Sequence, residues 1–233
     1  MIVSHRHKFI FIRTAKTAGS SMELALERQC GPEDICPPIH KRPEQVLTGE
    51  EGYVARNYRG RFLPRMRSDM ILKQLGRDLR DLKLGRRYWD HMSAFEVRAR
   101  IGEAVFGNYF KFCFERNPWD RMVSSFFWQR SRIRNCPQDF ESYIRNWRAR
   151  ENYELYTFNN KVIVDFVGRY ENLDRDWPYA LSKTGIAHPL ELGRAKSNWR
   201  PKDSSYREYY NAETRDIVAK RYAATIDLLG YTF

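Results

Sequence analysis

The sequence predicts a single α/β domain of three layers, in which helices flank a central parallel sheet. Two observations lead to this prediction. Short, continuously apolar runs, which suit strands covered on both faces, alternate along the chain with helical patterns. The length of 233 residues also suffices for one well-buried core. Aromatic residues make up 15% of the chain, which excludes a globally disordered protein.

The elements of this domain follow from local signals. After the first apolar run, Ser20 and Glu23 have the spacing of a capping box, so we expect a helix with Ser20 as its N-cap. After the second run, Asn117 and Pro118 predict the start of another helix. The runs predicted to be strands cover residues 9–12, 110–114 and 162–167.

The two remaining regions differ in regularity. Residues 211–230 predict a C-terminal helix, with one apolar face formed by Val218, Tyr222, Ile226 and Leu229. Prolines and glycines interrupt the pattern between residues 31 and 88. We therefore expect residues 31–88 to be a variable insertion in a domain that spans residues 1–233, with too few core-forming residues to fold alone.

Positive charge is concentrated in this insertion. The whole chain has a net charge of +12. Residues 56–87, which begin with Arg56 and end with Arg87, hold eleven basic and three acidic residues, a net charge of +8. The excess indicates an anionic partner. The segment is either a solvated insertion or a surface for a polyanion or a highly charged small molecule.

We find no pattern typical of a targeting signal or of a metal site in the sequence. No run approaches the roughly 20 apolar residues of a membrane span, and the basic N-terminus lacks the apolar centre of a signal peptide, so we expect a cytoplasmic protein. The cysteines form no CxxC pair and match no zinc spacing, so no metal is expected. Cys113 is predicted to be a buried thiol, and a disulfide between Cys30 and Cys36 has no support without an export signal.

The first motif that carries chemistry is Thr-Ala-Lys-Thr-Ala-Gly-Ser-Ser at residues 14–21, between the first strand and its helix. Small residues at a helix N-terminus present backbone N–H groups and the positive end of the helix dipole to an anion. Lys16 adds a positive charge, and hydroxyl donors follow it. Because Lys16 precedes the glycine, the order differs from that of an ordinary magnesium-dependent P-loop enzyme. The motif is either a phosphate site or a tight turn with a solvated lysine.

The second motif is Glu-Arg-Asn-Pro-Trp-Asp-Arg-Met-Val-Ser-Ser-Phe at residues 115–126. Arg116 falls at the carboxyl end of the second strand, the edge where open α/β sheets bind ligands. Ser124 follows about two helical turns later, near the same face. Together they suit a second phosphate. In the alternative interpretation, Arg116 pairs with an acid and Ser124 fills a helix interface.

These two motifs resemble the nucleotide-binding signatures of the PAPS-dependent sulfotransferases, and in particular those of the carbohydrate (Golgi membrane-type) branch. Residues 166–173 and the end of the chain, from Tyr206 to Phe233, resemble the same branch. The similarity covers about residues 8–30 and 88–233. Because no membrane anchor is seen, the chain is similar to a soluble, bacterial-type member.

The resemblance implies a P-loop-NTPase-like fold and a donor substrate, PAPS (3′-phosphoadenosine 5′-phosphosulfate), that leaves as PAP. Arg116 and Ser124 would then grip the 3′-phosphate. Residues 196–202 resemble a loop that closes over the nucleotide, which suggests Arg200 and Lys202 as further contacts. The residues that would wrap the 5′-phosphosulfate are Lys16, Thr17, Ala18, Gly19, Ser20 and Ser21.

His91 is the candidate base for the acceptor hydroxyl, which by the resemblance belongs to a carbohydrate. It precedes a second capping box, Ser93 with Glu96, so it is expected in a loop before a helix. A histidine suits removal of a hydroxyl proton near neutral pH. Lys16 would neutralise the charge that grows on the departing nucleotide. Alternatively, His91 is a structural histidine.

Two other functions compete with sulfotransfer. A nucleic-acid-binding module would use the alternating Arg59, Arg61, Arg65 and Arg67, although no recognition motif accompanies them, so nucleic acid is not the expected partner. A P-loop-like kinase would need a magnesium-binding acid after a strand, and Asp165 falls within a predicted strand instead. If the chain is a sulfotransferase, the basic segment is a candidate surface for an anionic saccharide acceptor.

Overall fold

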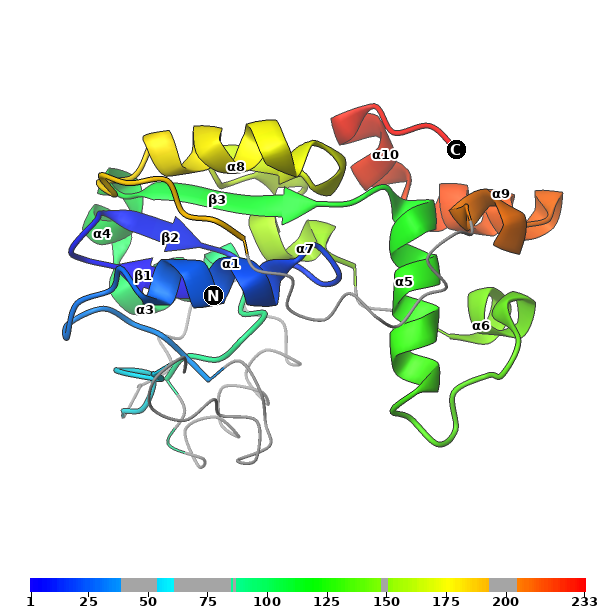
Figure 1. Ribbon diagram of the computed structural model, residues 1–233, viewed down its shortest axis with the longest axis horizontal. Helices are drawn as coiled ribbons and strands as arrows, with labels where there is room; N and C mark the ends of the chain where they lie inside the picture. The colour runs from blue at the N-terminus through cyan, green and yellow to red at the C-terminus, as the bar shows by residue number, and fades with distance from the viewer. Residues whose placement is uncertain (39–53, 61–84, 86, 148–150, 193–204) are drawn as a thin grey trace.

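The computed structural model describes residues 1–38, 54–60, 85, 87–147, 151–192 and 205–233. Its centre is a four-stranded sheet with the order β1-β2-β3-β6 (Figure 1). The strands β2 (Phe9–Phe11), β3 (Phe110–Glu115) and β6 (Phe166–Arg169) run parallel. At the edge, β1 (Ile2–Ser4) pairs antiparallel with β2.

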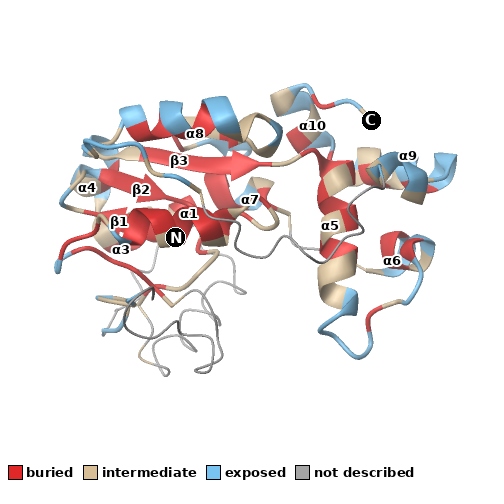
Figure 2. Ribbon diagram, viewed as in Figure 1, coloured by how far each residue is buried: buried red, intermediate tan, exposed pale blue. Residues whose placement is uncertain are grey.

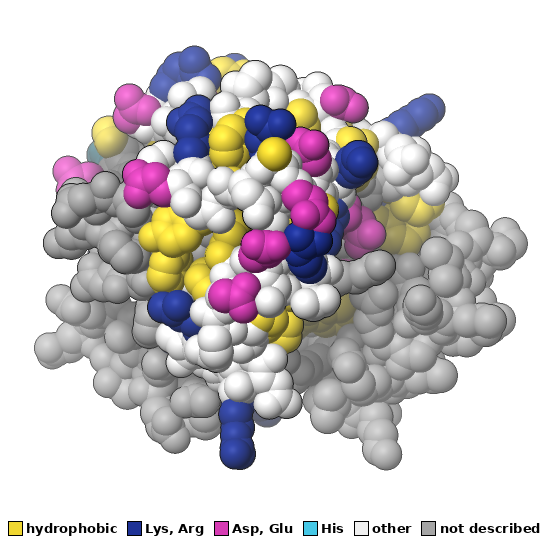
Figure 3. Space-filling model, turned by 90° about the vertical axis from the view of Figure 1, so that its right-hand side faces the viewer, with side chains coloured by type: hydrophobic (Ala, Val, Ile, Leu, Met, Phe, Trp, Pro, Cys, Tyr) yellow, Lys and Arg dark blue, Asp and Glu magenta, His cyan; other side chains and the backbone are white. Residues whose placement is uncertain are grey.

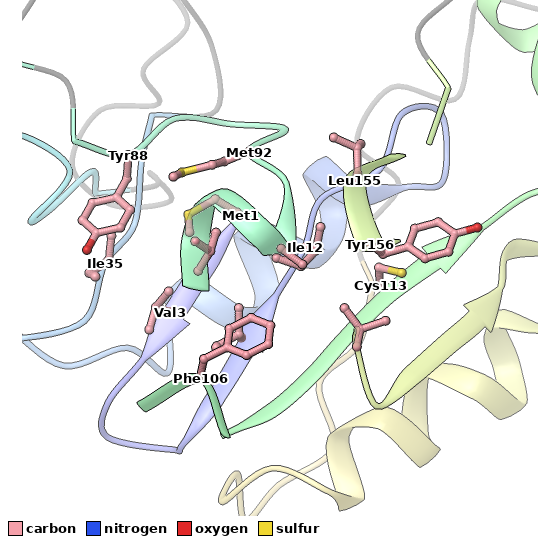
Figure 4. Packing of buried hydrophobic residues seen from close by; sticks show 14 residues of the cluster. Met1, Val3, Ile12, Ile35, Tyr88, Met92, Phe106, Cys113, Leu155 and Tyr156 are labelled. Atoms are coloured by element: carbon pink, nitrogen blue, oxygen red, sulfur yellow. The ribbon is translucent and has the colours of Figure 1, made fainter. Parts of the chain in front are cut away.

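Helices flank this sheet because side chains of β2 and β3 alternate between two buried clusters (Figure 2). The phenylalanines of both strands pack against α1 (Gly19–Glu27) and α8 (Leu173–Ser182). Ile10 and Cys113 pack against α3 (Ala94–Ile101), α4 (Glu103–Asn108) and α7 (Tyr153–Tyr156) (Figure 4). The predicted parallel sheet flanked by helices is thereby confirmed.

A third cluster lies beyond the carboxyl end of β3, where α5 (Pro118–Arg130) begins (Figure 1). There α5 packs with α6 (Phe140–Asn146), η3 (Tyr206–Tyr209), α9 (Ala212–Arg221) and α10 (Ala223–Leu229). On the face drawn in Figure 3, basic and acidic side chains are interspersed. Between α6 and α9, Arg145 pairs with Glu141 at 2.7 Å and also with Glu213.

The third predicted strand is wrong as one element, because the structure divides residues 162–167 between two sheets. A small hairpin contains β4 (Thr157–Phe158) and β5 (Lys161–Val162), and η2 (Tyr170–Asn172) follows β6. Asp165 separates β5 from β6. Its carboxylate accepts the Lys111 backbone N–H and pairs with the Lys111 ammonium, both at 2.8 Å. The chain therefore turns at Asp165 before it enters the main sheet.

The C-terminal helix is interrupted where one helix was predicted. Its start at Asn211 and its end at Gly230 are as predicted, and the structure shows that Asn211 caps the start and that Gly230 is left-handed. Tyr222, at φ −114° and ψ 25°, separates α9 from α10, and its ring is buried in the third cluster. Cys113 is fully buried, as predicted, and all four cysteines are free thiols.

One close contact fixes the spacing of β3 and β6. A Cβ added to Gly168 would lie 2.5 Å from the ring of Phe114, the residue beside it on the neighbouring strand. The ring of Phe114 therefore occupies the volume that a side chain at position 168 would need. Glycine is required at this position by the close packing of the two strands.

Most of the predicted insertion lies outside the described residues, including Arg61, Arg65 and Arg67. The arginines at the two ends of the basic segment, residues 56–87, bind the protein itself. The guanidinium of Arg56 donates to the carbonyl oxygens of Cys30 and Gly31 at 3.0 and 3.2 Å and pairs with Glu27, so it binds the last residue of α1 and the turn that follows. Arg87 donates to a carbonyl of α3. Among the described helices, none has the length and apolar character needed to span a bilayer.

Candidate functional site

The loop of residues 14–21 leaves the carboxyl end of β2 and enters α1 (Figure 1). Lys16 and Ala18 adopt positive φ angles of 66° and 62°, whereas Thr17 between them does not. Such alternation turns successive backbone N–H groups toward one side, a geometry that binds anions. Left-handed conformations of residues other than glycine cost about 1–3 kcal/mol each and cluster at functional sites.

The predicted capping box of α1 is wrong. The N-cap is Ala18, which makes no side-chain cap, and α1 begins at Gly19. Ser20 and Glu23 instead bind the buried Arg13, whose Nη2 donates to the Ser20 hydroxyl at 2.8 Å and whose Nη1 pairs with Glu23 at 2.7 Å. A buried guanidinium needs such partners. Ser20 and Glu23 therefore bind Arg13 and do not cap α1.

Close packing holds the rest of the loop. Thr17 is 1% exposed, and its hydroxyl lies 2.8 Å from that of Thr14, which donates to the Phe114 carbonyl of β3. The Thr17 hydroxyl therefore points into the protein. A Cβ at Gly19 would lie 3.0 Å from Cγ of Arg13, so glycine lets the loop approach this side chain closely.

Arg116 follows β3 directly and contacts this loop. Its Nε and Nη2 bind the Asp120 carboxylate at 2.7 Å, and its Nη1 donates to the Lys16 carbonyl at 3.2 Å. The guanidinium carbon also lies 4.2 Å from the ring centre of Tyr170. The acid pairing expected in the alternative interpretation is thus present, together with a contact that joins both motifs.

Lys16 reaches the face of α5 that carries Ser124. Its ammonium lies 5.4 Å from the ring centre of Trp128, one helical turn after Ser124. Ser124 is half-buried. The structure therefore brings Lys16, Arg116 and Ser124 to one region between the loop and α5. Arg200 and Lys202 lie outside the described residues.

His91 lies beside the start of the same loop, ahead of α3 with its predicted Ser93–Glu96 capping box, which is confirmed. The backbone of His91 is left-handed, at φ 54°. Its Nδ1 lies 3.1 Å from the Arg13 carbonyl oxygen, which only accepts hydrogen bonds. Nδ1 therefore carries a proton, and in the neutral form of the ring Nε2 is the basic nitrogen. The Asp90 carboxylate lies 4.0 Å from Nε2.

Two residues of this region gave no sequence motif. Arg13 follows a buried strand directly, and a charge in that position is a signal that could have been used. Asn152 binds Ala15 from 137 residues away, and no local pattern marks it.

Asp165, the residue considered for a kinase, precedes β6 and pairs with Lys111 near the start of β3. Asp165 therefore lies at the amino ends of the parallel strands, whereas Arg116 follows the carboxyl end of β3. Within the described ranges, His, Cys, Asp and Glu form no group of three that could hold a metal ion.

One of the comparisons with known proteins identifies a family. The sequence profile of the sulfotransferase family matches residues 1–232. An uncharacterized protein of Archaeoglobus fulgidus is 38% identical over 106 residues, which cover 43% of this chain and 88% of that protein. No solved structure matches the chain.

Proposed function

Since the chain belongs to the sulfotransferase family, we propose that it transfers the sulfuryl group of PAPS to an acceptor hydroxyl on a carbohydrate. PAPS is the donor substrate in this proposal, PAP is the product, and transfer needs no metal ion. The proposal includes a three-layer, P-loop-NTPase-like architecture. The alternation of strand side chains between two helix-covered clusters supports that arrangement.

The observation that carries the proposal is the bond between Arg116 and the carbonyl of Lys16, at 3.2 Å. These residues belong to the two motifs and stand 100 positions apart in the sequence. A nucleotide with a phosphate at 3′ and a phosphosulfate at 5′ needs two anion sites in one groove. The residues present fit such a nucleotide, because the loop with left-handed Lys16 and Ala18, the Lys16 ammonium and the Arg116 guanidinium lie in one region.

The proposed chemistry divides between His91 and Lys16. As the acceptor oxygen forms its bond to sulfur, the hydroxyl proton passes to Nε2 of His91, and the S–O bond to the nucleotide breaks. Asp90, 4.0 Å from Nε2, favours the imidazolium that forms. The electron pair stays on the departing phosphate oxygen. Lys16 and the N–H groups at the start of α1 neutralise this charge, as in phosphoryl transfer.

The acceptor class follows from the resemblance to the carbohydrate branch. An anionic saccharide would suit the basic segment of residues 56–87, with Arg59, Arg61, Arg65 and Arg67 as its contacts. Arg56 is left out of this part of the proposal, because its guanidinium is bound to Glu27 and to the turn that follows α1.

The test measures binding and transfer separately. Calorimetry with PAP in the absence of magnesium should show binding, and ADP with magnesium should bind more weakly. Incubation with PAPS and a mixture of saccharides should then yield sulfated products by mass spectrometry. Tighter binding of ADP with magnesium, or no transfer from PAPS to any hydroxyl acceptor, would overturn the proposal.

Two arginines provide a matched pair of variants for this test. Arg116 and Arg145 both form ion pairs at helical i,i+4 spacing, with Asp120 and Glu141. Arg116→Ala should reduce PAP affinity about tenfold or more, since charge-assisted bonds are strong. Arg145→Ala should leave PAP affinity unchanged. Equal effects of the two variants would contradict a nucleotide site at Arg116.

A further inference from the structure

Asn152 joins the two halves of the candidate site although it belongs to neither motif. The residue is 1% exposed. Its Oδ1 accepts the Ala15 N–H at 2.8 Å, and its Nδ2 donates to the Ala15 carbonyl at 3.1 Å. Both backbone groups of one loop residue are thus bound by a single side chain. The same Nδ2 also donates to Oε2 of Glu115 at 3.1 Å.

Glu115 continues this link to Arg116. It is fully buried at the end of β3, and its Oε2 accepts the Arg116 N–H at 3.2 Å. The Tyr156 hydroxyl donates to Oε1 at 3.2 Å. In Figure 4 this hydroxyl points along β3 toward its carboxyl end. Burial raises the pKa of Glu115, whereas Arg121 and the donors from Asn152, Arg116 and Tyr156 oppose that rise.

We propose that Asn152 is a positioning residue that, through Glu115, sets the spacing between the loop of residues 14–21 and Arg116. The inference rests on the proposed function, because it concerns how one nucleotide is held at both ends. Asn152 lies outside both motifs, so the inference assigns a function to a residue that the motifs do not include.

The spacing matters because PAP is bivalent. A ligand with phosphates at both ends gains from the second contact only when both anion sites fit its length. Sites that are fixed in advance lose less entropy when the ligand binds. The link through Asn152 is sheltered from water, and it is hydrogen-bonded at every step from Ala15 to Arg116.

The experiment compares adenosine 3′,5′-bisphosphate (PAP) with adenosine 5′-phosphate by calorimetry. The Kd of adenosine 5′-phosphate divided by the Kd of PAP measures how much affinity the 3′-phosphate adds to a nucleotide already held through its 5′-phosphate. In Asn152→Ala this ratio should fall about tenfold, the effect of about 1.4 kcal/mol. In Tyr156→Phe, which removes the bond to Oε1 of Glu115 together with the interaction of this hydroxyl with Thr225, the fall should be about two- to threefold.

The outcomes separate positioning from simple structural support. If Asn152 only orders the loop, both Kd values rise by the same factor and the ratio stays constant, which would overturn the inference. An unchanged Kd for both ligands would also overturn it. If the wild-type protein does not bind PAP at all, the proposed function fails, and the inference fails with it.

Two controls protect the result. Asn211→Ala removes an asparagine that caps α9, in the third cluster, and should leave the ratio unchanged. Circular dichroism before each titration checks that the variants are folded. If Asn152→Ala does not fold, Tyr156→Phe decides the question, because it deletes one hydroxyl group, and a constant ratio in that variant overturns the inference.

Discussion

The two segments that we propose to bind the nucleotide obtain their conformations in different ways. The loop of residues 14–21 holds two residues at positive φ and is fixed by partners far away in the sequence, such as Asn152 and Arg116. The start of α5 needs no positive φ, and Asn117 caps it by accepting the Trp119 N–H at 3.0 Å. Pro118 occupies the first helical position.

The conformation of the loop depends on contacts with distant residues, whereas that of the α5 start depends on its own sequence. A cap and a proline favour their helix in any context, whereas the left-handed Lys16 and Ala18 persist only because surrounding contacts hold them. The first segment should therefore respond to changes in strain and in distant partners. The second should respond to its own capping side chain.

The largest expected effect is at Lys16. Lys16→Ala should reduce the rate of sulfuryl transfer by about 10²–10³-fold, because it removes a charge directed at the leaving group. Lys16→Gly should lose the same activity but be about 1 kcal/mol more stable than Lys16→Ala, since glycine adopts positive φ without strain. Turnover assays and urea unfolding measure the two quantities. Near-normal transfer by Lys16→Ala would refute its catalytic role.

A smaller effect is expected at the start of α5. Asn117→Ala should destabilise the protein by about 1–2 kcal/mol, through loss of the cap and of the bond from its Nδ2 to the Thr232 carbonyl at 2.9 Å. Asn117→Ser keeps a capping oxygen and should recover at least half of this loss. Thermal unfolding checks both variants. A serine variant as unstable as the alanine variant would show that the distant contact with Thr232, rather than the cap, holds this helix start.

The smallest effect is expected at Ala18. Ala18→Gly should stabilise the protein by about 0.5 kcal/mol, because the relief of strain at φ 62° exceeds the added entropy of the unfolded chain. The exposed Ala99, inside α3, gives the matched control, since glycine there should cost about 1 kcal/mol. Denaturant midpoints distinguish the two. Similar losses for both variants would mean that the loop is not strained.

Much of the fold could be predicted because its signals are local. The apolar runs at residues 9–12 and 110–114 predicted β2 and β3, Asn117 and Pro118 predicted the start of α5, and the apolar face of residues 211–230 predicted α9 and α10. The edge strand β1 was missed because three residues carry no period. Residues 162–167 were misjudged because Asp165 binds Lys111, a contact across the chain that the run does not reveal.

The site shows the same limit. Lys16 and Arg116 stand in recognisable motifs, so their meeting at one edge of the sheet could be expected. The Ser20 cap was wrong because Arg13 is buried beside it and takes its hydroxyl. The contact of Asn152 with Ala15 depends on the folded chain, and no spacing in the sequence encodes it.

The contact between Gly168 and Phe114 has an evolutionary consequence. Because the aromatic ring fills the volume of the absent side chain, the two positions should change together among relatives. A relative with alanine or serine at the position of Gly168 should carry a smaller side chain at that of Phe114. An alignment of relatives would then record, as linked substitutions, how β3 and β6 keep their close packing.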